Sequence, residues 1–210
     1  MSERRLAAAV SAAALAAFAL LSYFLFPWHR PAQADAVPLP KTISSAGTHL
    51  APVTVPRGFP TNTVALLSQS VRAPIDPVAV GPDDYLTIPG DVHRIGHYTG
   101  GGPLDGSTGD LLLAGHVNYV GQGTGAFGRI GELHLGDAIL TRGSGHTQAW
   151  RVTGLTSYLK TDGLPSSIFR AHGSRVLTLV TCGGTLDTAA HSYLSNIVVT
   201  AKPARAVPAA

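Results

Sequence analysis

Beyond residue 60, apolar residues come in short packets that Gly, Pro and Asp separate. Packets of this length, bounded by turn-forming residues, are typical of strands rather than of helices. The packets are residues 64–67, 75–80, 86–89, 96–98, 111–115, 138–141, 149–155, 176–181 and 197–201. About eight short strands at this spacing predict an all-β domain, either a closed barrel or a sandwich, with short helices near 125–133 and 164–170.

A long apolar run near the start of the chain predicts a membrane span. Residues 6–26 are 21 consecutive apolar or small residues, enough to cross a bilayer as a helix. Arg4 and Arg5 precede the run and favour a cytoplasmic tail over residues 1–5. We therefore expect a single-pass signal anchor at 6–27 in the cell membrane, with the bulk of the chain outside the cytoplasm.

The segment after this run has two interpretations. Proline recurs through residues 28–60 without the period of a helix or a strand, which predicts an extended extracytoplasmic linker before a folded domain at 61–205. The tripeptide Ala32-Gln33-Ala34 also resembles a small-x-small cleavage site, so a cleaved signal peptide is the alternative.

Composition and charge narrow the class of protein. With 45% hydrophobic and 13% charged residues, the 210-residue chain can bury one core once the apolar run is set aside. The 24 Gly and 15 Pro residues follow no short period, which indicates many turns. The net charge is only +3 and the basic residues are scattered, so a nucleic-acid partner is not expected.

The single cysteine, Cys182, is a candidate nucleophile. It follows the apolar run 176–181 and directly precedes Gly183 and Gly184. We expect the chain to leave its strand there, with the Gly183 N–H uncrowded and suited to an oxyanion site. A free thiol needs a base or a cation beside it to become a thiolate. The alternative is a small buried hydrophobic residue.

His116 is the candidate partner, because it also follows an apolar run, residues 111–115, and histidine is the side chain best suited to acid/base chemistry near neutral pH. A histidine in that place could instead be a hydrogen-bonded cap of the strand. One cysteine and dispersed histidines form no H-E-x-x-H or C-x-x-C spacing, so neither a metal nor another cofactor is expected.

The two motifs occur together in a recognisable pattern. The sequence LLLAGHVNYVGQG contains His116, and a G-x-F-G-x-I-x-x-L-x-x-G-D block runs from Gly125 to Asp137. The sequence LTLVTCGG then places Cys182 66 residues after His116. This pattern resembles the sortase family over about residues 64–203, and the double glycine resembles its class F, actinobacterial group.

The resemblance implies a closed eight-stranded barrel and a cysteine transpeptidase. Cys182 would attack the carbonyl after the threonine of an LPXTG-like sorting signal and form a thioester. His116 would protonate the leaving amine and later deprotonate the incoming one. The implied partners are sorting-signal peptides of surface proteins and an amine from a cell-wall precursor or a pilin, with the membrane reached through the N-terminal helix.

One family feature is absent. Sortases carry an arginine near the start of the last strand, but residues 191–199 contain none. Its place falls on His191 or Asn196, each a weaker donor to an oxyanion than a fixed charge. An arginine from elsewhere could fold into the site; the candidates are Arg129, Arg142, Arg151, Arg170 and Arg175. The alternatives are a weak or silent sortase-like surface binding domain, and a wall enzyme of the L,D-transpeptidase type.

Overall fold

The computed structural model describes residues 36–39, 42–44, 50–82 and 85–210. Residues 36–210 form one folded unit, and the predicted membrane span lies outside the described residues. Within the described ranges no helix is long and apolar enough to span a membrane.

Eight strands close into a barrel, as the resemblance implied. They are β3 (Thr63–Leu66), β4 (Val71–Val78), β5 (Ile95–Tyr98), β6 (Asp110–Ala114), β9 (Ala138–Arg142), β10 (Thr147–Leu159), β11 (Val176–Asp187) and β12 (Ser192–Ala204). Their order around the barrel is β10-β12-β11-β6-β5-β4-β3-β9, and β9 pairs again with β10 to close the ring. The β4–β5 and β6–β11 pairs are parallel, and the others are antiparallel.

The barrel interior is filled by one apolar core. Alternate residues of each strand point inward, so Leu111 and Leu113 of β6 lie in this core with Leu177 and Leu179 of β11. Trp150 is fully buried there, and its indole N–H donates to the Thr141 hydroxyl at 2.9 Å. The inner positions are therefore committed to packing, which leaves the outer face for chemistry.

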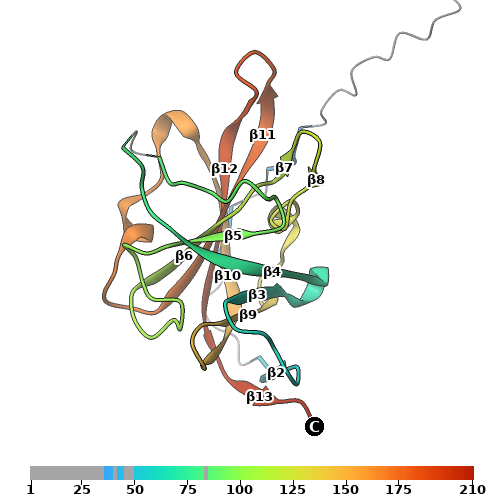
Figure 1. Ribbon diagram of the computed structural model, residues 1–210, viewed down its shortest axis with the longest axis vertical. Helices are drawn as coiled ribbons and strands as arrows, with labels where there is room; N and C mark the ends of the chain where they lie inside the picture. Colours follow the sequence, from blue (N-terminus) through green and yellow to red (C-terminus); the bar gives the residue numbers. More distant parts are fainter. Residues whose placement is uncertain (1–35, 40–41, 45–49, 83–84) are drawn as a thin grey trace, which may run out of the picture. The chain divides into compact units, whose positions relative to one another are not determined.

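Short strands and 3-10 helices lie outside the eight strands of the barrel. The short strands are β1 (Ile43–Ser44), β2 (Val53–Val55), β7 (Asn118–Tyr119), β8 (Gly123–Thr124) and β13 (Ala206–Pro208). The 3-10 helices are η1 (Leu67–Gln69), η2 (Ile130–Glu132), η3 (Lys160–Asp162) and η4 (Ser166–Phe169). In Figure 1 the β11–β12 and β7–β8 hairpins lie at one end of this unit, and β2, β13 and the C-terminus lie at the opposite end.

Two sequence predictions differ from this fold. The packet at 86–89 forms no strand; only Leu86 makes a bridge, with Val80. Residues assigned to the linker also pair with the domain: Val37 bridges Gly184, β1 pairs with β10, and β2 pairs with β13. The compact unit Ala36–Ala210 includes these segments. Short segments such as these lack a periodic signal, because their partners lie far away in the sequence.

Candidate active site

The parallel pairing of β6 with β11 brings His116 and Cys182 to neighbouring positions. Every pair in this ladder joins residues 66 apart in number, from Asp110 and Val176 to Ala114 and Val180. His116 and Cys182 are also 66 apart, two residues beyond the last pair. The two segments stay paired beyond the end of β6, because the Gly115 N–H donates to the Val180 carbonyl at 3.0 Å. The Thr181 hydroxyl also donates to the Gly115 carbonyl, at 2.8 Å.

Cys182 lies on the outer face of the barrel. Leu177 and Leu179 belong to the inner core, whereas Val180 belongs to a separate buried cluster outside it. Since side chains alternate along a strand, Cys182 shares the outer face with Val180. The same alternation on β6 puts Ala114 outside, and His116 follows on that side if the strand direction continues.

A buried apolar cluster, named here the outer cluster, lies on this face beside the Cys182 position. Its buried members are Leu112, Ala114, Ile168, Val180 and Val198. Half-buried residues pack around them, namely Leu86, Ile88, Tyr98, Tyr158, Leu164 and Phe169. The connection between β10 and β11 carries three of these residues, so that connection and the barrel wall enclose apolar surface directly next to the candidate nucleophile.

Both candidate catalytic side chains are half-buried. Neither forms a hydrogen bond to another residue of the described ranges. The His116 ring lies edge-on to the Tyr119 ring, with 5.6 Å between centroids and 64° between planes. Catalytic hydrogen bonds often tighten only when substrate binds, so this geometry is compatible with an acid/base pair.

Gly183 and Gly184 play a different part from the one expected. β11 does not end at Cys182; it continues to Asp187 with a register shift between Gly183 and Leu186. A Cβ on Gly183 would lie 2.5 Å from Ile197 Cδ1, so a larger residue there would force the Ile197 side chain to move. Gly184 has a φ of +80°, and its N–H donates to the Val37 carbonyl at 2.8 Å. The Gly184 N–H is therefore engaged by the chain itself.

The two suggested replacements for the family arginine lie apart. Asn196 of β12 is the direct cross-strand partner of Cys182 and is half-buried. His191 is exposed in the turn between β11 and β12, with a φ of +49°. It precedes Asn196 by five positions, roughly 16 Å at the usual rise per residue of a strand. The structure brings Asn196, and not His191, next to the nucleophile.

The other arginines considered are occupied away from Cys182. Arg129 pairs with Glu132, with 2.6 Å between Nη2 and Oε2. Three more bind groups elsewhere: Arg142 the Phe59 carbonyl, Arg151 the Gly136 and Ala51 carbonyls, and Arg175 the Gly106 carbonyl and the Gln148 side chain. Arg170 follows η4 and acts electrostatically on Asp110, which begins β6 four residues before Ala114.

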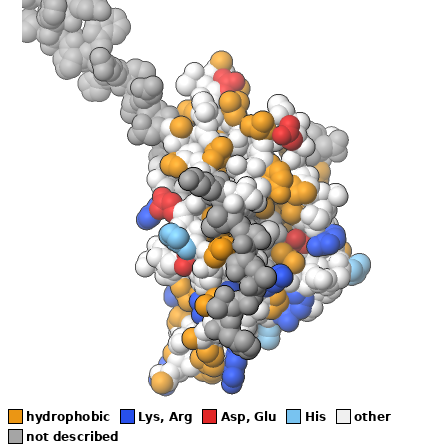
Figure 2. Space-filling view, turned by 180° about the vertical axis from the view of Figure 1, so that it is seen from behind, with side chains coloured by type: hydrophobic (Ala, Val, Ile, Leu, Met, Phe, Trp, Pro, Cys, Tyr) orange, Lys and Arg blue, Asp and Glu red, His pale blue; other side chains and the backbone are white. Residues whose placement is uncertain are grey.

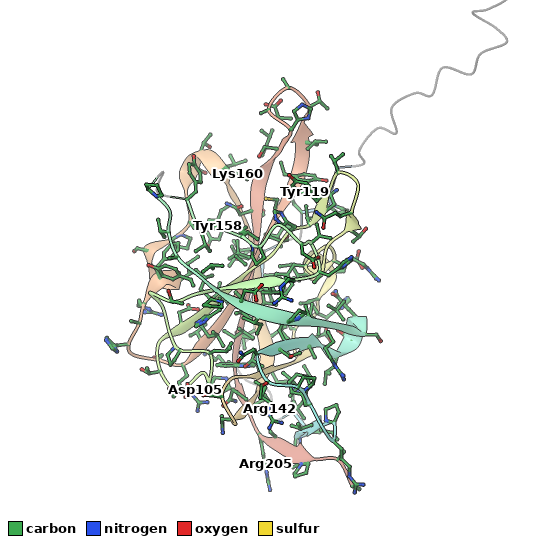
Figure 3. The ribbon with its side chains drawn as sticks, viewed as in Figure 1. Asp105, Tyr119, Arg142, Tyr158, Lys160 and Arg205 are labelled. Atoms are coloured by element: carbon green, nitrogen blue, oxygen red, sulfur yellow. The ribbon has the colours of Figure 1, made fainter. Side chains whose placement is uncertain are left out.

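Sequence reasoning missed two aromatic residues at the site. Tyr119 contacts His116, and Tyr158 of β10 is the cross-strand partner of Asn196. Figure 3 shows Tyr119 on one side of the β11–β12 hairpin, with Tyr158 and Lys160 on the other. Strand pairing creates these neighbours, so no local motif could have identified them. Among the described residues, no group of three potential metal ligands is present.

The fold is thus a closed β-barrel in which the pairing of β6 with β11 brings His116 and Cys182 to neighbouring positions. Residues 76–204 match the family described as "Sortase domain". The chain belongs to the sortase family. No curated protein matches it.

Solved sortase structures share the fold. Sortase A from Corynebacterium diphtheriae is 17% identical with a TM-score of 0.51, and the match covers 67% of this chain and 59% of that one. Sortase A from Listeria monocytogenes is 17% identical with a TM-score of 0.50, and the match covers 68% of this chain and 86% of that one. Sortase C from Streptococcus pneumoniae is 15% identical with a TM-score of 0.50, and the match covers 68% of this chain and 67% of that one.

Proposed function

We propose that this protein is a membrane-anchored cysteine transpeptidase that cleaves an LPXTG-like sorting signal and transfers the carried protein to a cell-wall or pilin amine. The observation that supports this most is the shared 66-residue offset, which aligns His116 with Cys182 on one face. The double glycine after Cys182 also leads us to assign the chain to the class F group. The apolar run 6–26 is the proposed anchor.

The chemistry follows from the pair. The Cys182 thiolate adds to the carbonyl carbon after the signal's threonine, and His116 donates a proton to the leaving amine as the C–N bond breaks. A thioester remains on Cys182. His116 then takes a proton from the incoming amine, whose nitrogen attacks the thioester carbonyl, and the C–S bond breaks to regenerate the thiolate.

We assign the apolar part of the signal to the half-buried residues that surround the outer cluster. The buried members of this cluster come mainly from β6, β11 and β12, and residues 164, 168 and 169 belong to it or pack against it. Burying a leucine-sized side chain there would stabilise the complex by about 1.5–3 kcal/mol. We assign this surface to the residues that precede the scissile bond.

Intact-mass measurement tests the proposal. The full chain in detergent micelles is incubated with LPXTG-like peptides, and an acyl adduct of the expected mass should appear on Cys182. The Cys182→Ala variant should give neither adduct nor cleavage while unfolding at the same temperature. Peptide binding without any adduct would instead support the silent binding domain, and cleavage by Cys182→Ala would refute the nucleophile.

A further inference from the structure

Four side-chain positions form one row across the outer face. Register pairs Cys182 of β11 with Asn196 of β12, and Asn196 with Tyr158 of β10. His116 extends the row on the other side of Cys182 through the β6–β11 offset. Directly opposed residues on one face have Cβ atoms about 4.5–5.5 Å apart, so each member of the row is within reach of the next.

The packing of the preceding residues fixes the face of Tyr158. Val198 pairs with Thr156 and lies in the outer cluster, and Tyr158 packs against the same cluster. Tyr158 and Asn196, each two positions farther along, therefore continue on that face toward the β11–β12 hairpin. The phenol ring is held by apolar contacts, and only its hydroxyl needs a polar partner.

Neither polar group of this pair is satisfied within the described ranges. The Tyr158 hydroxyl and the Asn196 carboxamide form no hydrogen bond there, although both side chains are half-buried. Tyr193 on the same strand contrasts with this, since its hydroxyl accepts from the Asn118 amide at 2.8 Å. Half-buried polar groups without partners next to a candidate nucleophile are suited to binding a ligand.

The arginines considered as replacements for the family cation have partners elsewhere. The five arginines considered above bind or act elsewhere, and on the face shown in Figure 2 the Lys and Arg side chains gather in the middle and lower parts rather than at the upper end. Lys160 is exposed, and its ammonium donates to the Ser192 hydroxyl at 2.8 Å. Asn196 is left as the side-chain donor beside Cys182.

We propose that Tyr158 is a positioning residue that orients the Asn196 carboxamide for catalysis. This inference rests on the function proposed above. The two groups do not hydrogen-bond to each other in the free protein; when the signal binds at Cys182, the Tyr158 hydroxyl donates to Asn196 Oδ1, which turns the Nδ2 group toward the carbonyl oxygen of the signal. An unoriented carboxamide would present its oxygen to the developing oxyanion half of the time, and that contact is repulsive. Two neutral groups thereby take over the task of the missing cation.

Steady-state kinetics of the full chain in detergent micelles test the relay with four proteins: wild type, Tyr158→Phe, Asn196→Ala and the double variant. Tyr158→Phe keeps the ring and should preserve the unfolding temperature. It should lower kcat for peptide cleavage about tenfold and change KM less than twofold, because the donor acts mainly in the transition state. In the Asn196→Ala background, removal of the hydroxyl should have no further effect.

Each result decides between the two proposals. If the wild type forms no acyl adduct and cleaves nothing, the proposed function fails and the relay fails with it. If the wild type is active and Tyr158→Phe keeps its rate within twofold, only the relay is refuted. A tenfold loss that persists in the Asn196→Ala background also refutes the relay, because Tyr158 would then act without Asn196.

Discussion

Replacing Asp110 by Asn should stabilise the protein at neutral and alkaline pH. Asp110 begins β6 and is 3% exposed, and its Oδ1 has no hydrogen-bond partner in the described part of the chain. Burial raises the pKa of this carboxyl from an ordinary 3.8 to about 6, although Thr178 and Arg170 oppose the shift. The folded state therefore favours the protonated carboxyl, which Asn imitates.

The sign and the size follow from linkage. A raised pKa in the folded state gives a contribution to stability that is full below about pH 4 and is lost as the pH rises through about 6. The shift corresponds to about 3 kcal/mol. Asp110→Asn should thus match the wild type at low pH and exceed its unfolding free energy by up to about 3 kcal/mol at pH 8.

Urea unfolding of the unit 36–210 at several pH values, followed by the fluorescence of buried Trp150, measures this difference. Asp105→Asn is the matched control. The Ser107 hydroxyl and N–H, with smaller contributions from His146 and Arg175, lower the pKa of Asp105, so this substitution should destabilise the protein throughout the range from pH 5 to 8. A difference for Asp110→Asn that does not grow between pH 5 and 8 would falsify the assignment.

Three further predictions concern the site and the anchor. Asn196→Ala should lower kcat/KM for peptide cleavage at least tenfold, whereas His191→Ala should stay within twofold of wild type; equal losses would show that the turn reaches the substrate. Leu194 is 48% exposed on the face of Cys182. The Leu194→Arg variant should raise kcat/KM for peptide cleavage severalfold, because it adds a cation near the oxyanion. An unchanged rate in steady-state assays would argue that no charge is missing from the site. Protease added to intact protoplasts should digest the domain and spare a short membrane-protected fragment; a soluble protein that starts near Asp35 would instead reveal a cleaved signal peptide.

The sequence predicted most of the strands because they are long enough to show apolar packets with turn residues between them; the closed barrel, as opposed to a sandwich, followed only from the family resemblance. It also located the helical turns near Ile130 and Ile168, although both are 3-10 helices. The end of β11 was misplaced: Gly183 and Gly184 signal a break, but the pairing with β12 continues past it. A local conformational signal cannot show whether a distant strand compensates for the break.

Only the site residues that lie in local sequence motifs could be predicted. His116 and Cys182 each follow an apolar run, so the sequence could single them out. The neighbourhood of Tyr158 and Asn196 arises from the register of β10 with β12, which is set by a bulge between Val152 and Gly154. A shift of one residue would move Tyr158 to the other face of the sheet. Only the folded chain specifies that register.

The parallel pairing of β6 with β11 also has a consequence for folding kinetics. The segment between His116 and Cys182 includes β9 and β10, and the two residues meet only after this long loop has closed. Contacts of such sequence separation form late, because the entropy of loop closure must be overcome before they are gained. Activity should therefore appear with the slowest refolding phase that completes the barrel, so that a partly folded chain carries a thiol but no catalytic pair.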